Sequence, residues 1–85
     1  MLSATVRGMT VSPSEWTELF ANRLGIASPS DDERDRLLEL AGTAAHASER
    51  TAAPISCWLA ARAGIDPGEA SRIGRDLADE LEAKG

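Results

Sequence analysis

Helix-start signals divide this sequence at four places, and they constrain its fold more than any other feature. Each signal is a capping residue with an acidic residue three positions later, a proline suited to the first turn of a helix, or both. They occur as "SPSE" at Ser12, "SDDE" at Ser30, "AAPIS" around Pro54 and "DPGE" at Asp66. We therefore expect four helices, with Pro54 at the first position of the third and Glu69 completing a capping box in the fourth.

Apolar residues recur at helical spacing behind each of these signals. Gly25 and Gly64 follow the first and third stripes, where a glycine is typical of a left-handed C-cap. Gly42 stands among small residues in the second helix and predicts a close helix crossing there. The side chains expected to face inward include Trp16, Leu19, Phe20, Leu24, Leu37, Leu38, Leu40, Ile55, Trp58, Leu59, Ala70, Ile73, Leu77 and Leu81.

No segment combines β-branched alternation with hairpin turns. The sequence predicts an all-α fold, a single small four-helix bundle with short loops. Residues 1–10 show no clear period and are expected to form a flexible N-terminal tail before a helical domain at 11–85. Fifteen alanines leave only a small core, and chains this short hold roughly 3–5 kcal/mol in one core. A protein partner, or weak self-association, would stabilise such a chain.

The charge balance narrows the classes of partner. The formal net charge is −5, and Lys and Arg form no cluster, so nucleic acid and an anionic membrane surface are both disfavoured. No apolar run approaches the ~20 residues of a transmembrane helix, and the N-terminus lacks the apolar stretch of a secretory signal. With a single cysteine, these features favour a cytoplasmic location.

His46 and Arg50 form the most distinctive pair in the chain, because their spacing places them on one helix face or in its last turn. One interpretation is structural: the two side chains satisfy the last carbonyls of their helix or pair with an internal acid. The other is an anion or carboxylate site, completed by free N–H groups at Ile55, Ser56 and Cys57. The binding residues predicted from the sequence are His46, Arg50, Pro54, Ser56 and Trp16.

The sequence gives less support to a metal site or a catalytic site. One His, one Cys and scattered acids do not supply the three or four ligands of a metal site. Cys57 and His46 lack an orienting third group for nucleophilic catalysis, so a buried structural cysteine is expected. Trp16 and Trp58 are expected in the core, and exposure of either would make it an interface candidate. We predict no catalytic residues, no metal and no cofactor.

Two segments carry a resemblance to a known family, "SEWTELFANRLGI" and "LLELAGTAAHASERTAAPISCWLAARAG". The chain resembles a small actinobacterial all-helical domain of unknown function, often encoded beside or fused to a molybdenum-cofactor guanylyltransferase. The matching positions are Trp16, His46, Arg50, Ala53 and Pro54. The resemblance implies a non-catalytic accessory module for molybdenum-cofactor maturation or molybdoenzyme assembly.

The partner that this resemblance implies is the guanylyltransferase, a cofactor chaperone or a molybdoenzyme. Two alternatives remain open from the sequence. One is a small structural subunit of a larger oxidoreductase complex. The other is an uncharacterised helical protein–protein interaction domain.

Overall fold

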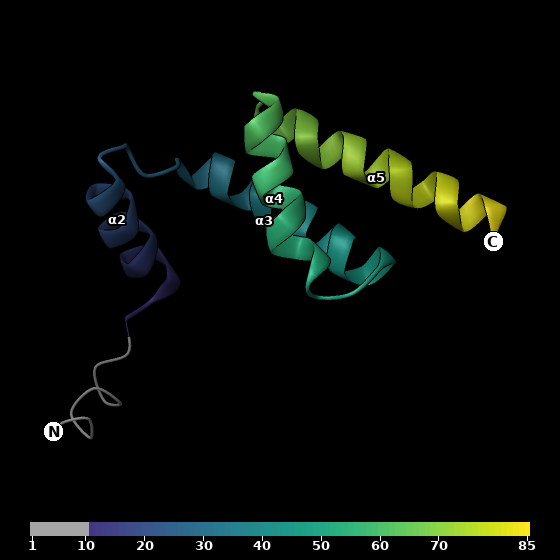
Figure 1. Ribbon diagram of the computed structural model, residues 1–85, viewed down its shortest axis with the longest axis horizontal. Helices are drawn as coiled ribbons and strands as arrows, with labels where there is room; N and C mark the ends of the chain where they lie inside the picture. The colour runs from purple at the N-terminus through teal and green to yellow at the C-terminus, as the bar shows by residue number, and fades with distance from the viewer. Residues whose placement is uncertain (1–10) are drawn as a thin grey trace, which may run out of the picture.

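The computed structural model of the protein describes residues 11–85, and within them the chain forms four helices and no strand. The helices are α2 (Pro13–Leu24), α3 (Asp31–Ala47), α4 (Ala52–Ala63) and α5 (Pro67–Lys84). The prediction of an all-α fold with four helices and short connections is confirmed (Figure 1). The predicted tail at residues 1–10 lies outside the described residues.

Capping boxes hold the starts of α2 and α3, as predicted. Ser12 Oγ accepts from the Glu15 N–H at 3.1 Å, and the Glu15 carboxylate accepts from the Ser12 N–H at 2.9 Å. Ser30 and Glu33 form the same pair of bonds, at 3.0 and 2.8 Å. Gly25, at φ 79°, ends α2 in the left-handed conformation that favours glycine. Local signals therefore set where these helices begin and end.

The capping box predicted for α5 is only half formed. Asp66 Oδ1 accepts from the Glu69 N–H at 3.0 Å. The Glu69 carboxylate does not return to the Asp66 backbone and pairs with Arg72 at 3.2 Å. A guanidinium one turn along the helix offers that carboxylate a charge-assisted bond, which is stronger than a bond from a neutral amide.

The start of α4 also differs from the expectation. The helix begins at Ala52, so Pro54 occupies its third position and not its first. The first four N–H groups of a helix have no acceptor within it, and a proline lacks only that N–H. The third position therefore tolerates Pro54 as well as the first would.

α3 is the central helix, and both α4 and α5 pack against it. α5 runs in roughly the same direction as α3, whereas α4 crosses α3 on the way back to the start of α5 (Figure 1). Ser71 of α5 bonds to Glu39 of α3, and the Cys57 thiol of α4 lies 3.9 Å from the Leu37 carbonyl oxygen. These three helices form the packed unit of the molecule.

α2 stands apart from this unit, at one end of the molecule (Figure 1). It contacts the start of α3 through a hydrogen bond from Arg34 Nη1 to Ser14 Oγ, at 3.2 Å. The radius of gyration is 15.6 Å, against about 12 Å for a compact domain of this length. The chain is therefore extended, and the apolar face of α2 has no cover from the other helices.

The seam between α3 and α5 is closed by small residues of α5. Ala70 and Ser71 are buried against α3, together with Leu40. A Cβ built on Gly74 would lie 2.8 Å from Leu40 Cδ1, whereas one built on Gly42 meets nothing within 4 Å. The close crossing predicted at Gly42 is therefore wrong, and Gly74 is the glycine at which the helices approach each other.

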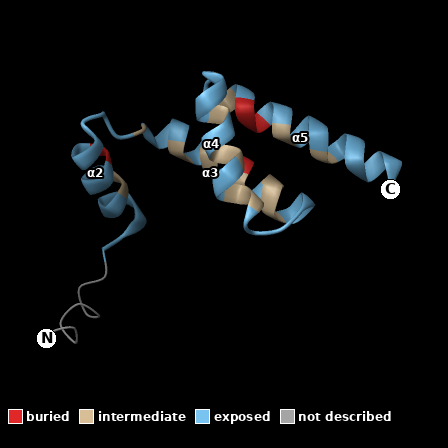
Figure 2. Ribbon diagram, viewed as in Figure 1, coloured by how far each residue is buried: buried red, intermediate tan, exposed pale blue. Residues whose placement is uncertain are grey.

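Most of the large apolar side chains expected in the core are exposed, and this corrects the inward-facing prediction for them. Among the described residues, the buried hydrophobic side chains are those of Ala21, Leu40 and Ala70. Figure 2 shows how little of each helix surface is covered. The sequence pattern identified the apolar faces correctly, but α3 alone cannot cover the faces of three other helices.

Candidate functional site

Thirteen large apolar side chains of residues 11–85 are between 42% and 63% exposed. A monomeric soluble protein rarely exposes so much apolar surface in contiguous patches, and such patches mark interaction sites. Ten of the thirteen lie on three surfaces, and Val11, Ile26 and Leu38 lie outside them. We name these the α2 stripe, the α4–α5 groove and the α4 face, and define each below.

The α2 stripe consists of Trp16, Leu19, Phe20 and Leu24. Each of these side chains is more than half exposed. The Trp16 and Phe20 rings stack at a centroid distance of 5.8 Å and an interplanar angle of 15°. The stacking fixes the two aromatic side chains as one flat apolar surface, and such preformed surfaces lose little entropy when a partner binds.

The α4–α5 groove lies between these two helices, with α3 beneath it. Its residues are Leu40 from α3, Ser56 and Leu59 from α4, and Ile73, Leu77 and Leu81 from α5. The part nearer the start of α4 has a volume of about 190 Å³. At one end it continues into a depression lined by His46 and Glu82. The groove is therefore apolar along its walls and polar at that end.

The α4 face consists of Pro54, Ile55, Trp58 and Arg62, which share one side of the helix by their spacing. Ile55 and Trp58 are 60% and 58% exposed. The guanidinium carbon of Arg62 lies 5.1 Å from the centroid of the Trp58 ring, in cation–π geometry. The exposed Trp58 meets the condition set in the sequence analysis for an interface candidate.

The predicted binding residues do not form one site. Trp16 is on α2, at the far end of the molecule from the close of α3, where His46 lies (Figure 1). His46 borders the polar end of the groove, and Ser56 lines its wall. Pro54 belongs to the α4 face, and Arg50 lies in the turn immediately before α4. The structure divides the predicted set among three surfaces.

The structural interpretation of His46 and Arg50 finds no contact that supports it. Both side chains are exposed, and within residues 11–85 neither makes an ion pair or a side-chain hydrogen bond. The C-cap of α3 is completed by backbone alone, from the Ser48 N–H to the Ala44 carbonyl oxygen at 2.9 Å. Both side chains are therefore available to a partner.

The amides proposed for an anion site at the start of α4 are already used. Because the helix begins at Ala52, the N–H groups of Ile55 and later residues lie within it. The N–H of Ala52 bonds to the Glu49 carbonyl oxygen at 2.9 Å, and that of Ala53 bonds to the Arg50 carbonyl oxygen at 3.1 Å. The next residue is Pro54, which has no N–H. An anion would be held here by side chains and not by the helix terminus.

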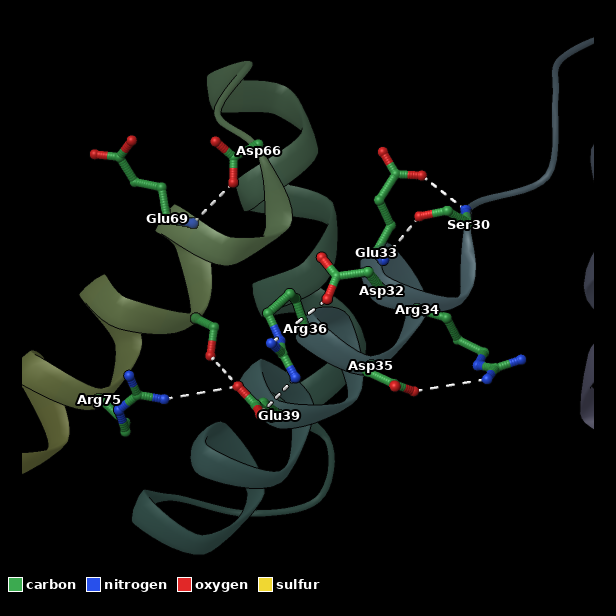
Figure 3. Close-up of polar contacts among 11 residues, drawn as sticks. Ser30, Asp32, Glu33, Arg34, Asp35, Arg36, Glu39, Asp66, Glu69 and Arg75 are labelled. Atoms are coloured by element: carbon green, nitrogen blue, oxygen red, sulfur yellow. Dashed lines mark hydrogen bonds and ion pairs between the residues drawn. The ribbon is translucent and has the colours of Figure 1, made fainter.

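Sequence reasoning missed the polar cluster around Glu39, which joins α3 to α5 (Figure 3). Ser71 Oγ donates to Glu39 Oε1 at 2.9 Å, and Arg36 donates to Glu39 Oε2 at the same distance. Arg75 lies 3.6 Å from Glu39 Oε1. Ser71 is the most buried polar residue described, at 2% exposure. The sequence signal for this burial is the position of Ser71 between Ala70 and Gly74, because small residues one turn apart favour close packing of helices.

Cys57 is half-buried, and not fully buried as the sequence predicts. Its thiol points at the Leu37 carbonyl oxygen across the α3–α4 contact, and burial raises the pKa of the thiol. A raised pKa lowers the fraction of thiolate, which is the reactive form. The part of the chain that the structure describes holds no group of three or more residues placed to bind a metal ion. None of its helices is both long and apolar enough to cross a membrane.

A family model described as "Domain of unknown function (DUF6457)" matches residues 10–84, which include all four helices. No curated protein and no solved structure matches the chain.

Proposed function

We propose that this chain, which belongs to the DUF6457 family, is a non-catalytic interaction module that binds a protein partner through its α4 face. The observation that carries the proposal is Trp58, which is 58% exposed and lies beneath the Arg62 guanidinium. Tryptophan and arginine are the residues most enriched among interface side chains that dominate binding energy. A tryptophan held in place by an arginine is preorganised for such a contact.

Charge supports the choice of α4 and indicates the chemistry of the partner. The chain as a whole carries a formal charge of −5, yet α4 contains no acidic residue. Arg62 lies on the face itself, and Arg50 lies just before the helix. Neither guanidinium forms an ion pair with another described residue. A partner surface with an apolar pocket for Trp58 and carboxylates at its edge would match this face.

The resemblance given above suggests which protein that partner is. It favours a molybdenum-cofactor guanylyltransferase, a cofactor chaperone or a molybdoenzyme, with this chain acting as an accessory module in cofactor maturation or enzyme assembly. In that setting the α4 face would hold the module on its client, and the two arginines would orient it by pairing with client carboxylates.

The test is affinity capture from the native host with tagged wild type, Trp58→Ala and Leu38→Ala chains. Leu38 is 62% exposed on α3 and belongs to none of the three surfaces, so it is the matched control. We expect a molybdenum-cofactor protein with wild type and Leu38→Ala, and its loss with Trp58→Ala. Removing a central tryptophan costs about 2 kcal/mol or more, which corresponds to roughly 30-fold in Kd.

Arg50→Ala adds a second readout to the same experiment. Its side chain is exposed and unpaired among the described residues, so the free energy of unfolding should change by less than about 0.5 kcal/mol while capture weakens. A captured partner unrelated to molybdenum would remove the molybdenum part of the proposal. Equal capture by Trp58→Ala and Leu38→Ala would contradict the α4 face as the binding surface.

A further inference from the structure

The connection between α2 and α3 contributes no bond to the helix on either side of it. α2 is closed by its own residues, since the Ile26 N–H bonds back to the Ala21 carbonyl oxygen at 3.0 Å. α3 begins with its own capping box at Ser30. Between these two ends lie residues 27–29, whose backbone makes no hydrogen bond to another described residue. The backbone there can therefore turn without breaking a bond in either helix.

Packing holds this connection little more than hydrogen bonds do. Residues 25–28 are exposed, and Pro29 is half-buried. Pro29 fixes its own φ and keeps the residue before it extended, so the freedom to turn lies mainly at Ala27. A short exposed segment between two separately closed elements is where rigid parts of a protein turn against each other. We call residues 27–29 the hinge.

The contact between α2 and α3 is small and polar. All four side chains of the α2 stripe are more than half exposed, so α2 buries no large apolar side chain against the other helices. The hydrogen bond from Arg34 Nη1 to Ser14 Oγ, at 3.2 Å, is the one side-chain bond between α2 and the rest of residues 11–85. The pocket beside it, of about 90 Å³, is lined mostly by polar residues, among them Thr17 and Glu18. Little apolar burial therefore opposes separation of the two helices.

The guanidinium that makes this bond is held by α3 itself. Arg34 lies 3.6 Å from Asp31 Oδ1 and 3.6 Å from Asp35 Oδ1, and both carboxylates belong to α3. If α2 moves away, Arg34 therefore keeps its ion pairs, and the Ser14 hydroxyl exchanges one exposed bond for a bond to water. Such a bond shifts an equilibrium by only about fivefold, so the bonded and separated arrangements should both be populated.

We propose that α2 is a movable arm that turns about the hinge, and that the bond from Arg34 to Ser14 is the latch that holds it against α3. In the latched state α2 lies as Figure 1 shows it. In the released state it keeps its helix, because its caps are local, and changes only its direction. The latch thus controls where the α2 stripe is presented. The α4 face takes no part, so the arm is independent of the function proposed above.

Pulsed electron–electron resonance between two spin labels measures the position of the arm. The labels are attached at Asn22→Cys on α2 and Asp79→Cys on α5, both exposed positions, in a Cys57→Ala chain whose native thiol cannot react. Labels at Leu38→Cys and Asp79→Cys form a reference pair within the packed unit of α3, α4 and α5, and show that this unit stays folded. We expect a broader distance distribution for the arm pair, with a latched and a released part.

Removing either partner of the latch should shift the arm pair toward the released part. Arg34→Ala and Ser14→Ala should each lower the ratio of latched to released chains by about fivefold, and Ser14→Ala does so with the ion pairs of Arg34 intact. Arg72→Ala is the matched control, because this exposed arginine pairs only within α5, and it should leave the distribution unchanged. An arm pair as narrow as the reference pair would overturn the movable arm. A broad distribution that neither variant shifts would overturn the latch.

Discussion

The two sides of α5 differ in a way that explains much of this molecule. Toward α3 it presents small residues, Ala70, Ser71 and Gly74, and this seam is closed. Toward α4 it presents Ile73 and Leu77, and this side is an open groove. Small side chains allow two helices to approach closely, whereas large ones keep them apart until something fills the space between. Around Leu40 the chain packs the small residues of α5 against α3, and it leaves the large apolar residues of α5 exposed.

The largest predicted effect comes from the one large side chain that the seam buries. Leu40 is 6% exposed and lies against Gly74. Leu40→Ala should lower the free energy of unfolding by about 2–4 kcal/mol, through lost burial and the cavity that remains. Because a core of this size holds roughly 3–5 kcal/mol, much of the protein should then be unfolded at 25 °C. Urea denaturation followed by circular dichroism measures the change.

Leu38 supplies the matched control for Leu40, two residues away on the same helix and 62% exposed. Leu38→Ala should change the free energy of unfolding by less than about 0.5 kcal/mol. If the two substitutions cost the same, the seam would not be where the stability of this chain lies, and the contrast between the two sides of α5 would lose its energetic basis.

The Glu39 cluster should have the next largest effect. Glu39→Ala leaves the buried Ser71 hydroxyl without its acceptor, which costs about 1–2 kcal/mol. Ser71→Ala removes the hydroxyl itself and should cost less, since alanine fits the seam and favours the helix. Once Ser71 is alanine, Glu39→Ala should cost less than it does in wild type. A double-mutant cycle by urea denaturation measures this coupling, and strict additivity would show that the bond contributes nothing.

The sequence predicted the helices well because their limits are set by neighbours in the chain. Ser12 needs only Glu15, three residues away, to cap its helix, and Gly25 needs only its own freedom at φ 79°. An amphipathic pattern, by contrast, states which face of a helix is apolar and not what covers it. Trp16 and Leu77 were placed in the core for this reason, and both are exposed.

The candidate surfaces were only partly predictable for the same reason. Trp58 was identified as an interface residue on the condition that it proved exposed, and it is. The groove depends on the direction in which α4 and α5 leave α3, which no local signal encodes. Ser71 was not singled out from the sequence, because its partner Glu39 lies 32 positions away along the chain. The sequence alone does not show which residues far apart along the chain come into contact in the fold.

Substitutions at two glycines inside helices should change the free energy of unfolding by a smaller amount. They compare an open position, Gly42, with a position in the α3–α5 seam, Gly74. Gly42 has nothing within 4 Å of an added Cβ, so Gly42→Ala should stabilise the protein by about 0.5–1 kcal/mol through helix propensity alone. Gly74→Ala should gain less, because its methyl group would lie 2.8 Å from Leu40 Cδ1 and the leucine must move. Thermal and urea denaturation of both variants give the difference. Equal stabilisation would mean that the seam yields to a methyl group at no cost.

The smallest predicted effect concerns the reactivity of the Cys57 thiol, which lies at the contact between α3 and α4. Burial raises the pKa of its thiol above the ordinary value, so the folded protein disfavours the thiolate. At pH 8 the native protein should react with iodoacetamide several times more slowly than the urea-unfolded chain, and the midpoint of its pH–rate profile should lie higher. The raised pKa also makes the free energy of unfolding depend on pH. The stabilisation that comes from burying the neutral thiol is complete below the pKa of the unfolded thiol. It is lost as the pH rises through the pKa of the folded thiol. Native and unfolded chains that react at the same rate with the same pH profile would show that the α3–α4 contact opens freely, and that only the α3–α5 seam holds the unit together.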